Sequence, residues 1–377
     1  MIKTKKSFSI LNFGLGAILI IFLACSDKKS QVLTTESFEN LIQDTLILSK
    51  DLNTAAISPS LAYFETDSGR FLLDFRKLHL VGYRYPEGDK GFEKFYQREG
   101  PDGLGDTDYK RALTKDGIFV IDADRKIHQA NFEGKVIQSW NLPSTPTDRL
   151  YSNYTVFPNN PITYYENEII ISDVPYVMNE KLIGYEDWLV RLNLNSEEWE
   201  YISFEYPEKL REFYEDPNLG PYSHYYNSKS NQAIISFPVV DSLMILENNQ
   251  TRWIDASPQE SLIFKKGKTV PSGEYTIFQP DHSSARYTWI TFDPFQKVYL
   301  RQVITGLKEN ESNSNQSYIS RIIVLDEDFK KLGEIENLPN TYQGFPTPDG
   351  YYFYLGSGKV EEKVKFARVN FSSFLKP

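Results

Sequence analysis

The sequence predicts an all-β protein, a six-bladed β-propeller whose ring is closed by an N-terminal strand. Six times along the 377 residues, an apolar stretch, a tight polar turn and a second apolar stretch follow one another, which is the pattern of a β-hairpin. The chain also contains 25 Tyr and 25 Phe but only 3 Met, and aromatic rings fit the pleated surface of a strand. Repeated β units of about 50 residues are typical of propellers.

The spacing between the turns of the six hairpins gives the length of the repeat. Gly and Asn at most of these turns supply the positive φ angles that hairpins require. The equivalent turn positions, separated by 48, 50, 64, 65 and 54 residues, are Gly69, Gly117, Asn167, Asn231, Gln296 and Gly350. A second pair of strands follows each of the first five hairpins, most clearly at 126–132 and 136–141. Each of these units therefore holds the four strands of one blade.

The sixth unit has only three predicted strands, and the last of them lies at Val364–Asn370. The segment Asp44–Ser49 has the pattern of a strand but belongs to no unit. If it pairs with the sixth unit, the ring closes and the exposed strand edges of an open sheet disappear. Two β-sandwiches, each formed by half of the chain, are the alternative, but no Pro/Gly/Ser-rich linker or charge run divides the middle. The one convincing helical turn lies at Glu208–Glu215.

Residues 1–24 are predicted to be a lipoprotein signal peptide. Three lysines precede an apolar run from Ile10 to Ala24, and Cys25, the only cysteine of the chain, follows at once. Cleavage before Cys25 would leave an N-terminus that carries acyl chains and is anchored in a bacterial membrane. An ordinary secretory signal and a signal anchor are the alternatives.

The lipid anchor predicts a location in the cell envelope. Ser26, rather than Asp, follows the cysteine, which favours the outer membrane, whereas the leaflet stays open. The predicted layout is a tether at residues 25–42 and the propeller domain at 43–377. No later segment approaches the length of a transmembrane helix.

The charge of the chain argues against nucleic acid as a partner. The full chain has a net charge of −10, and loss of three lysines with the signal peptide leaves 38 basic against 51 acidic residues, or −13. Such a chain, without a basic run, repels phosphate backbones. The mature part also has no cysteine pair, so its stability must come from burial of a core rather than from disulfides.

One stretch resembles a known family. The sequence Glu99–Gly105 (EGPDGLG), which joins the first two units, together with Gly117–Asp122 and the following Lys126-Ile127, is similar to the six-bladed, TolB-like propeller lipoproteins of Bacteroidetes. Within these, the chain resembles most a family catalogued as a domain of unknown function. The resemblance implies the lipoprotein signal and the propeller scaffold, and it brings no catalytic residue with it.

The positions of the long insertions predict which face of the propeller carries the functional site. In a propeller, the turns inside the two hairpins of a blade share one face, and the connections between hairpins and between blades share the other. Nearly all long segments fall in the second set, and loops carry binding groups while blades hold them in place. Loops that merely pack against one another are the alternative. The long segments are Glu99–Asp108, Pro143–Asn160, Val174–Asp187, Glu205–Pro221, Asp255–Arg286 and Thr305–Ile319.

Seven residues near the starts of innermost strands are the candidate ligand-binding residues. Aromatic rings with an Arg or a His among them can bind sugars or peptide side chains by stacking and hydrogen bonding. For each residue, packing inside the blades is the competing interpretation. The candidates are Arg111, Tyr164, His224, Tyr225, Arg286, Tyr287 and Tyr342.

No catalytic or metal signature occurs, so we expect neither a catalytic residue nor a metal or other cofactor. The four histidines are dispersed, without zinc-site spacing, and there is no nucleophile elbow or phosphate loop. The acidic cluster Asp102, Asp106 and Asp108 is the best candidate for a calcium loop, and a solvated turn is the simpler interpretation.

Two functions follow from these observations. The first is a membrane-anchored, non-catalytic binding module for a protein, peptide or glycan of the envelope. The alternative is a hydrolase or lyase of the propeller type, with a carboxylate- or calcium-centred site at the channel mouth. We favour the first, and three or more carboxylates or an arginine cluster converging in the channel would favour the second.

Overall fold

The computed structural model describes residues 33–375, except 52–53, 55, 107–110, 115–116, 144–158, 176, 249, 308–317 and 358–361. The predicted signal peptide, Cys25 and residues 26–32 of the predicted tether lie outside the described residues. So do Asp108 and much of the predicted loops Pro143–Asn160 and Thr305–Ile319. Residues 34–377 form one compact unit, and the following description concerns this unit.

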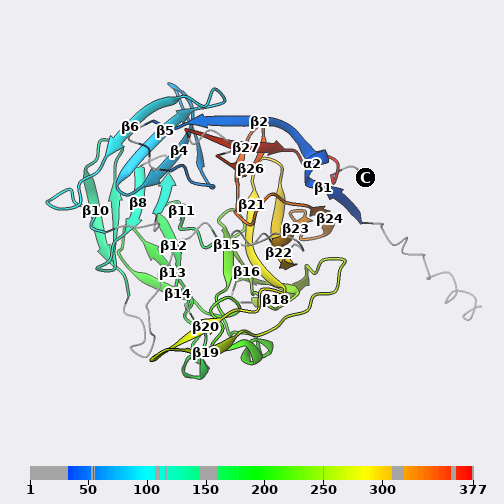
Figure 1. The fold of residues 1–377 in the computed structure, drawn as a ribbon. Helices are drawn as coiled ribbons and strands as arrows, with labels where there is room; N and C mark the ends of the chain where they lie inside the picture. Colours follow the sequence, from blue (N-terminus) through cyan, green and yellow to red (C-terminus); the bar gives the residue numbers. More distant parts are fainter. Residues whose placement is uncertain are drawn as a thin grey trace, which may run out of the picture. The chain divides into compact units, whose positions relative to one another are not determined.

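The unit is a six-bladed β-propeller, as predicted, in which antiparallel sheets follow one another around a ring (Figure 1). From the innermost strand outward, blade 1 is β3 (Ala62–Thr66), β4 (Gly69–Arg76), β5 (His79–Arg84) and β6 (Lys90–Phe95). Blade 2 is β7 (Arg111–Thr114), β8 (Gly117–Ile121), β9 (Lys126–Ala130) and β10 (Val136–Asn141). Blade 3 is β11 (Thr163–Tyr165), β12 (Glu168–Ser172), β13 (Leu189–Asn193) and β14 (Trp199–Ile202).

The second half of the ring continues in the same order. Blade 4 is β15 (Ser223–Asn227), β16 (Gln232–Ser236), β17 (Ser242–Glu247) and β18 (Gln250–Asp255). Blade 5 is β21 (Arg286–Asp293), β22 (Val298–Leu307), β23 (Tyr318–Leu325) and β24 (Lys331–Glu336), with β1 (Thr34–Ser37) added at its outer edge. Blade 6 is β25 (Phe345–Thr347), β26 (Gly350–Gly356), β27 (Lys363–Val369) and β2 (Ile42–Ser49).

The core of the propeller lies between neighbouring blades. In the described part of the chain, buried apolar side chains form one cluster at each of the six junctions. Between blades 1 and 2, for example, Phe75 and Leu80 pack with Ile118 and Val120, and all four are fully buried. Each blade is therefore stabilised by both neighbours, because a single four-stranded sheet cannot cover its own two apolar faces.

The N-terminal strand closes the ring, which confirms the predicted pairing. β2 runs antiparallel to β27 along its length, with Leu46 opposite Phe366 and Ser49 opposite Lys363. In Figure 1 the two strands lie side by side, one blue and one red, although they come from opposite ends of the unit. The sixth blade thus contains three C-terminal strands and one N-terminal strand.

A second N-terminal strand was not expected from the sequence. β1 pairs in parallel with β24 of blade 5, from Thr34 opposite Gly333 to Ser37 opposite Glu336. A single helical turn, α2 (Phe38–Leu41), then leads into β2, and its Phe38 and Leu41 are buried between blades 5 and 6. Residues 34–42, assigned to the tether from the sequence, therefore belong to the propeller unit.

The long insertions that are described fold locally. The helical turn expected at Glu208–Glu215 is the 3-10 helix η2 (Glu208–Phe213), and a second 3-10 helix, η1 (Glu180–Leu182), precedes it. The insertion between blades 4 and 5 contains a separate hairpin, β19 (Lys268–Ser272) and β20 (Tyr275–Gln279). Among the described residues, no helix has the length and apolar character needed to cross a membrane.

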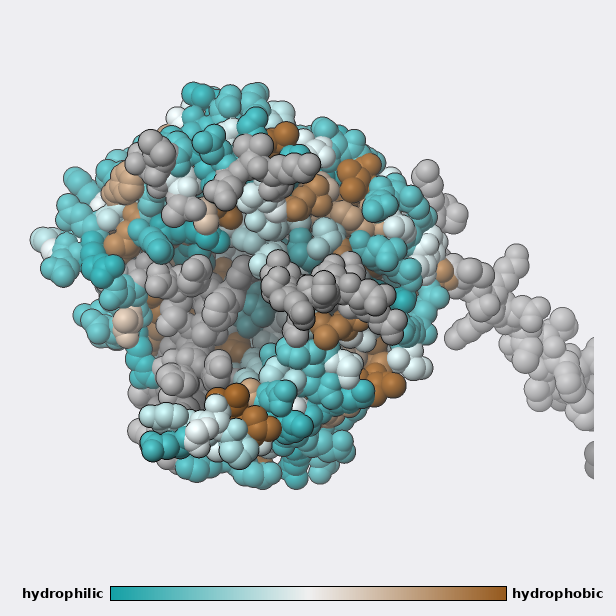
Figure 2. Space-filling model, viewed as in Figure 1, coloured by the Kyte–Doolittle hydropathy of each residue, from teal (hydrophilic) through white to brown (hydrophobic). Residues whose placement is uncertain are grey.

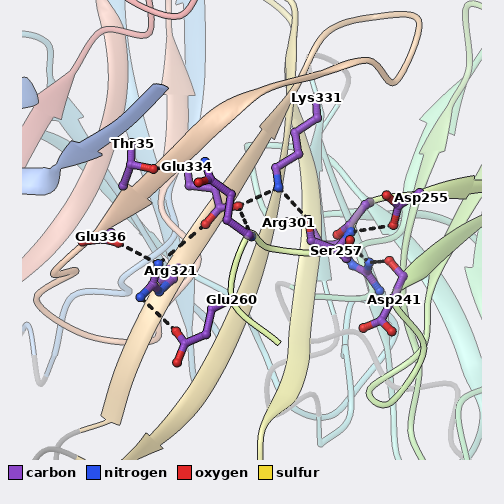
Figure 3. Close-up of polar contacts among 12 residues, drawn as sticks. Thr35, Asp241, Asp255, Ser257, Glu260, Arg301, Arg321, Lys331, Glu334 and Glu336 are labelled. Carbon is purple, nitrogen blue, oxygen red and sulfur yellow. Dashed lines mark hydrogen bonds and ion pairs between the residues drawn. The ribbon is translucent and has the colours of Figure 1, made fainter. Parts of the chain in front are cut away.

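A charge network centred on the buried Glu334 fixes the start of this insertion and β1 to blade 5 (Figure 3). Glu334, fully buried on β24, accepts hydrogen bonds from Lys331 Nζ and from the Gln259 backbone N–H, each at 2.6 Å. The Gln259 side chain in turn donates to Thr35 Oγ1 of β1 at 3.2 Å. Arg321 on β23 pairs with Glu336 at 2.6 Å and with Glu260 of the insertion at 2.9 Å.

A buried arginine ties blade 5 to blade 4. Arg301 on β22 is fully buried, and its guanidinium donates to Ser236 Oγ at 2.9 Å. It also donates to the carbonyl oxygens of Val240, Asp241 and Ala256, which lie in the turn before β17 and just after β18. Burial lowers the pKa of Arg301 to about 10, so the side chain stays charged at neutral pH.

Candidate functional site

The innermost strands surround a cavity with a volume of about 880 Å³. On β21 its lining begins at Arg286, the first residue of the strand, and reaches Pro294, which follows the last. The cavity therefore runs along the innermost strands, and we call it the axial cavity. All six blades, or the segments leading into them, contribute side chains to it, among them Ala62, Ala112, Ile162, Tyr225, Thr288 and Pro346.

Four of the seven predicted site residues line the axial cavity. Arg111 and Tyr225 extend from β7 and β15, Arg286 from the start of β21, and Tyr342 from the segment before β25. Tyr342 is 52% exposed. Figure 2 shows that the surface around the ring is largely hydrophilic in this view, with apolar groups in small separate patches.

The other three predicted residues pack inside or between blades. Tyr164 lies against Phe119, with ring centroids 5.0 Å apart, at the junction of blades 2 and 3. Tyr287 is 3% exposed, donates its hydroxyl to Asp241 at 3.0 Å, and stacks on the guanidinium of Arg301. These contacts account for the two tyrosines as structural residues.

His224 is fully buried. Its Nδ1 and its backbone N–H both lie within hydrogen-bond distance of Asn160 Oδ1, at 2.9 and 3.1 Å. Burial lowers the pKa of His224 to about 3, so the imidazole is neutral at pH 7. A neutral ring that solvent does not reach is suited to fixing the segment before β11 against β15, rather than to contacting a ligand.

The period of the strand explains this division. Successive side chains of a β-strand point to opposite faces, so one of two neighbours can line the cavity while the other packs inside the blade. In the pair His224 and Tyr225, only Tyr225 lines the cavity, and in the pair Arg286 and Tyr287, only Arg286 does. The prediction chose both members of each pair.

Sequence reasoning missed Arg76 and the neighbours Thr288 and Trp289. Arg76 is the last residue of β4, a second strand rather than an innermost one, and β4 extends past the start of β3 toward the cavity. Thr288 is the extra residue of a β-bulge, because Tyr287 and Trp289 face consecutive residues of β22. The bulge breaks the alternation and lets both neighbours line the cavity.

Among the described residues that line the axial cavity, the charged ones are arginines. Arg111 pairs through Nη2 with Asp74 Oδ1 at 3.5 Å, and Asp74 Oδ2 accepts the Ser58 backbone N–H at 2.9 Å. Burial raises the pKa of Asp74, while the positive charges of Arg111 and Arg76 oppose this rise. The guanidinium of Arg286 lies 4.8 Å from the ring centroid of Tyr318. No Asp or Glu is among the described residues that line the cavity.

The candidate calcium loop does not form a metal cluster in the described part of the chain. Asp102 accepts the Val136 backbone N–H at 3.1 Å, and Asp106 pairs with Arg98 at 2.9 Å, whereas Asp108 lies outside the described residues. More generally, the described residues contain no group of three or more His, Cys, Asp or Glu side chains placed to hold a metal ion.

Comparisons with known proteins place the chain in a family. Among curated proteins, none matches. A solved structure from Bacteroides vulgatus, described as a member of the DUF4221 family, is 18% identical, covers 87% of this chain and 97% of its own, and has a TM-score of 0.62. A second, a "putative exported protein" from Bacteroides fragilis, is 10% identical, covers 89% of this chain and 98% of its own, and has a TM-score of 0.53.

At these identities, the two structures are evidence for the propeller fold alone. The family follows from the sequence model of DUF4221, a domain of unknown function, which matches residues 36–336. This match begins in β1 and ends with β24, so it spans five of the six blades and most of the chain. The chain therefore belongs to the DUF4221 family.

Proposed function

We propose that this protein is a lipid-anchored, non-catalytic binding module of the bacterial cell envelope that holds its ligand in the axial cavity. The observation that carries the proposal is the cavity itself, which side chains from six blades surround with arginines and aromatic rings. Its volume of about 880 Å³ falls in the range of roughly 300–1,000 Å³ in which proteins hold small ligands. A sugar or a short peptide segment fits such a space, and a larger partner would insert one part of itself.

Of the two features given above as favouring an enzyme, the lining has the arginines but no carboxylate among its described residues. The arginines would suit an enzyme with an anionic substrate as well as a binding protein. A hydrolase or lyase with a carboxylate- or calcium-centred site, however, needs carboxylates at the reacting centre. The described residues that line the cavity include none, and the nearby Asp74 is occupied by Arg111 and Ser58. The enzyme is therefore our second candidate.

Substitutions in the cavity test the binding role. Replacing Arg286 and Tyr342 with Ala removes a charge and an exposed ring from the lining without opening the core, so we expect ligand capture to fall by about tenfold or more. The measurement is mass spectrometry of small molecules and peptides that co-purify with the full chain from envelope extracts, followed by their titration onto each variant. The matched control replaces Arg252 and Tyr201, which lie on outermost strands. Equal capture by both double variants would refute the assignment.

The lipid anchor and the outer-membrane location rest on the N-terminal sequence, and the description of the Bacteroides fragilis protein as a "putative exported protein" supports only export in general. Cys25→Ala is expected to abolish incorporation of labelled palmitate and to leave the protein either as precursor or in the soluble fraction. The neighbouring Ser26→Ala is the control and should stay lipidated. Full processing of the Cys25→Ala chain with unchanged membrane retention would contradict the anchor.

A further inference from the structure

Within the proposed binding function, on which this inference rests, we infer that the ligand is an organic carboxylate. Its acidic group would bind beside Arg76 and Arg111, and its apolar or ring-shaped part would lie against the aromatic side chains of the axial cavity.

The charge balance of the cavity points to an anion. Three arginines line it, namely Arg76, Arg111 and Arg286, and no Asp or Glu is among the described residues of its lining. The described lining therefore carries an excess of positive charge, and Asp74, which pairs with Arg111, is not part of it. This excess stands against the net charge of −10 of the whole chain, so it is local to the channel. Clefts with one sign of charge concentrate ligands of the opposite sign.

Arg76 and Arg111 are prepared for a carboxylate. Asp74 holds Arg111 in place from one side, and the Ser58 backbone N–H occupies the second oxygen of Asp74. The positive charge of Arg76 also acts on Asp74, but the Nε of Arg76 is buried and has no hydrogen-bond partner among the described residues. A guanidinium presents parallel N–H donors that match the two oxygens of a carboxylate, which gives such pairs both strength and direction.

The remaining lining favours a ligand with an apolar or ring-shaped part. Tyr225 of blade 4 and Tyr342 of the segment before blade 6 both face the cavity, and rings of this kind stack on sugars and on aromatic side chains. Arg286 comes from blade 5, three blades along the ring from Arg111 of blade 2. The acidic group therefore has one arginine pair on one side of the channel, and Arg286 with Tyr342 can contact the rest of the ligand.

A structural role alone does not account for all three arginines. Arg111 is explained by Asp74, and Arg286 by its stacking on Tyr318. Arg76 has no ion pair of its own among the described residues, and its buried Nε lacks a hydrogen-bond partner, which is unfavourable. Binding of an anion would remove this cost.

The test compares acids with their neutral counterparts on the full chain. N-acetyl-phenylalanine and D-galacturonate carry the carboxylate on a peptide-like and on a sugar ligand, and N-acetyl-phenylalanine amide and D-galactose lack it. Titration calorimetry at probe concentrations up to about 10 mM would detect a Kd of about 1 mM. We expect one acid to bind at least about tenfold more tightly than its neutral counterpart, and less tightly as the salt concentration rises.

Variants locate the binding. Arg76→Gln should reduce the affinity for the acid by about tenfold or more, and Arg76→Lys, which keeps the positive charge, should reduce it less. Arg252→Gln is the matched control, because Arg252 also stacks on an aromatic ring, that of Phe329, but lies on the outermost strand of blade 4. Circular dichroism checks that each variant is folded.

The outcomes separate this inference from the proposed function. Binding of one acid that depends on Arg76 supports the inference, and the acid that binds identifies the ligand as peptide-like or sugar-like. Equal binding of an acid and its neutral counterpart overturns the inference while the binding module stands. An affinity unaffected by Arg76→Gln, or no binding of any probe, also overturns it, and the capture experiment with the Arg286 and Tyr342 variants decides the proposed function independently.

Discussion

Deletion of residues 26–49 is expected to unfold the propeller, whereas deletion of residues 26–33 is expected to leave its melting temperature within about 2 °C of the full chain. The longer deletion removes β1, α2 and β2, and so exposes the edges of β24 in blade 5 and of β27 in blade 6. The shorter deletion ends before the first residue of β1.

The size of this effect follows from the side chains that would be lost. Phe38, Leu41, Leu46 and Leu48 are at most 7% exposed. Burial of each contributes about 1.5–3 kcal/mol, so their loss removes about 6–12 kcal/mol, which is comparable with the total stability of a typical protein. Differential scanning calorimetry of the two truncated chains would measure the difference, and equal melting temperatures would refute the role of β2 in closure.

A point substitution separates burial from strand pairing. Leu48 is fully buried and the adjacent Ile47 is 39% exposed, although both lie in β2. We expect Leu48→Ala to lower the free energy of unfolding by about 2–5 kcal/mol and Ile47→Ala by less than about 1 kcal/mol. Similar losses in urea titrations would mean that the closing strand contributes through its backbone alone.

Arg301→Met is expected to destabilise the protein by about 3–5 kcal/mol. Met keeps much of the volume of the arginine stem but cannot donate, so the carbonyl oxygens of Val240, Asp241 and Ala256 lose their partner. An unsatisfied buried acceptor costs about 1–3 kcal/mol. The change in the free energy of unfolding can be measured by urea titration.

The control for this prediction is Arg252→Met, in which an exposed arginine is replaced on β18. Substitutions at exposed positions usually change stability by less than about 0.5 kcal/mol. If Arg301→Met is no more destabilising than Arg252→Met, then water or a shifted backbone satisfies the three carbonyl groups, and Arg301 is not the connection between blades 4 and 5 that we describe.

The fold was largely predictable because the repeated turn residues indicate where the backbone forms hairpins. Turn positions such as Gly117 and Gly350 have positive φ angles, as the hairpin pattern requires. The pairing of Asp44–Ser49 with the last blade followed from counting strands. β1 could not be predicted in the same way, because four polar or small residues, Thr34–Ser37, have no apolar alternation, and only the neighbouring edge of β24 makes them a strand.

The site was predictable by position but not by side-chain direction. Arg111, Tyr225, Arg286 and Tyr342 line the axial cavity because innermost strands begin beside it. Local pattern does not say which of two neighbours faces the channel, since residues of an innermost strand are apolar or aromatic on both faces. Arg76 was missed because its approach to the cavity depends on how far β4 extends past β3, which is a property of the paired strands.

The pairing of β2 with β27 also sets the order of events during synthesis. Leu46 and Phe366 face each other although they are 320 positions apart in the chain, so this contact forms only after almost the whole protein has left the ribosome. β2 therefore stays unpaired until the last strand, β27, has been synthesised. A chain that ends before Lys363 lacks the partner of β2 altogether, so ring closure distinguishes complete chains from incomplete ones.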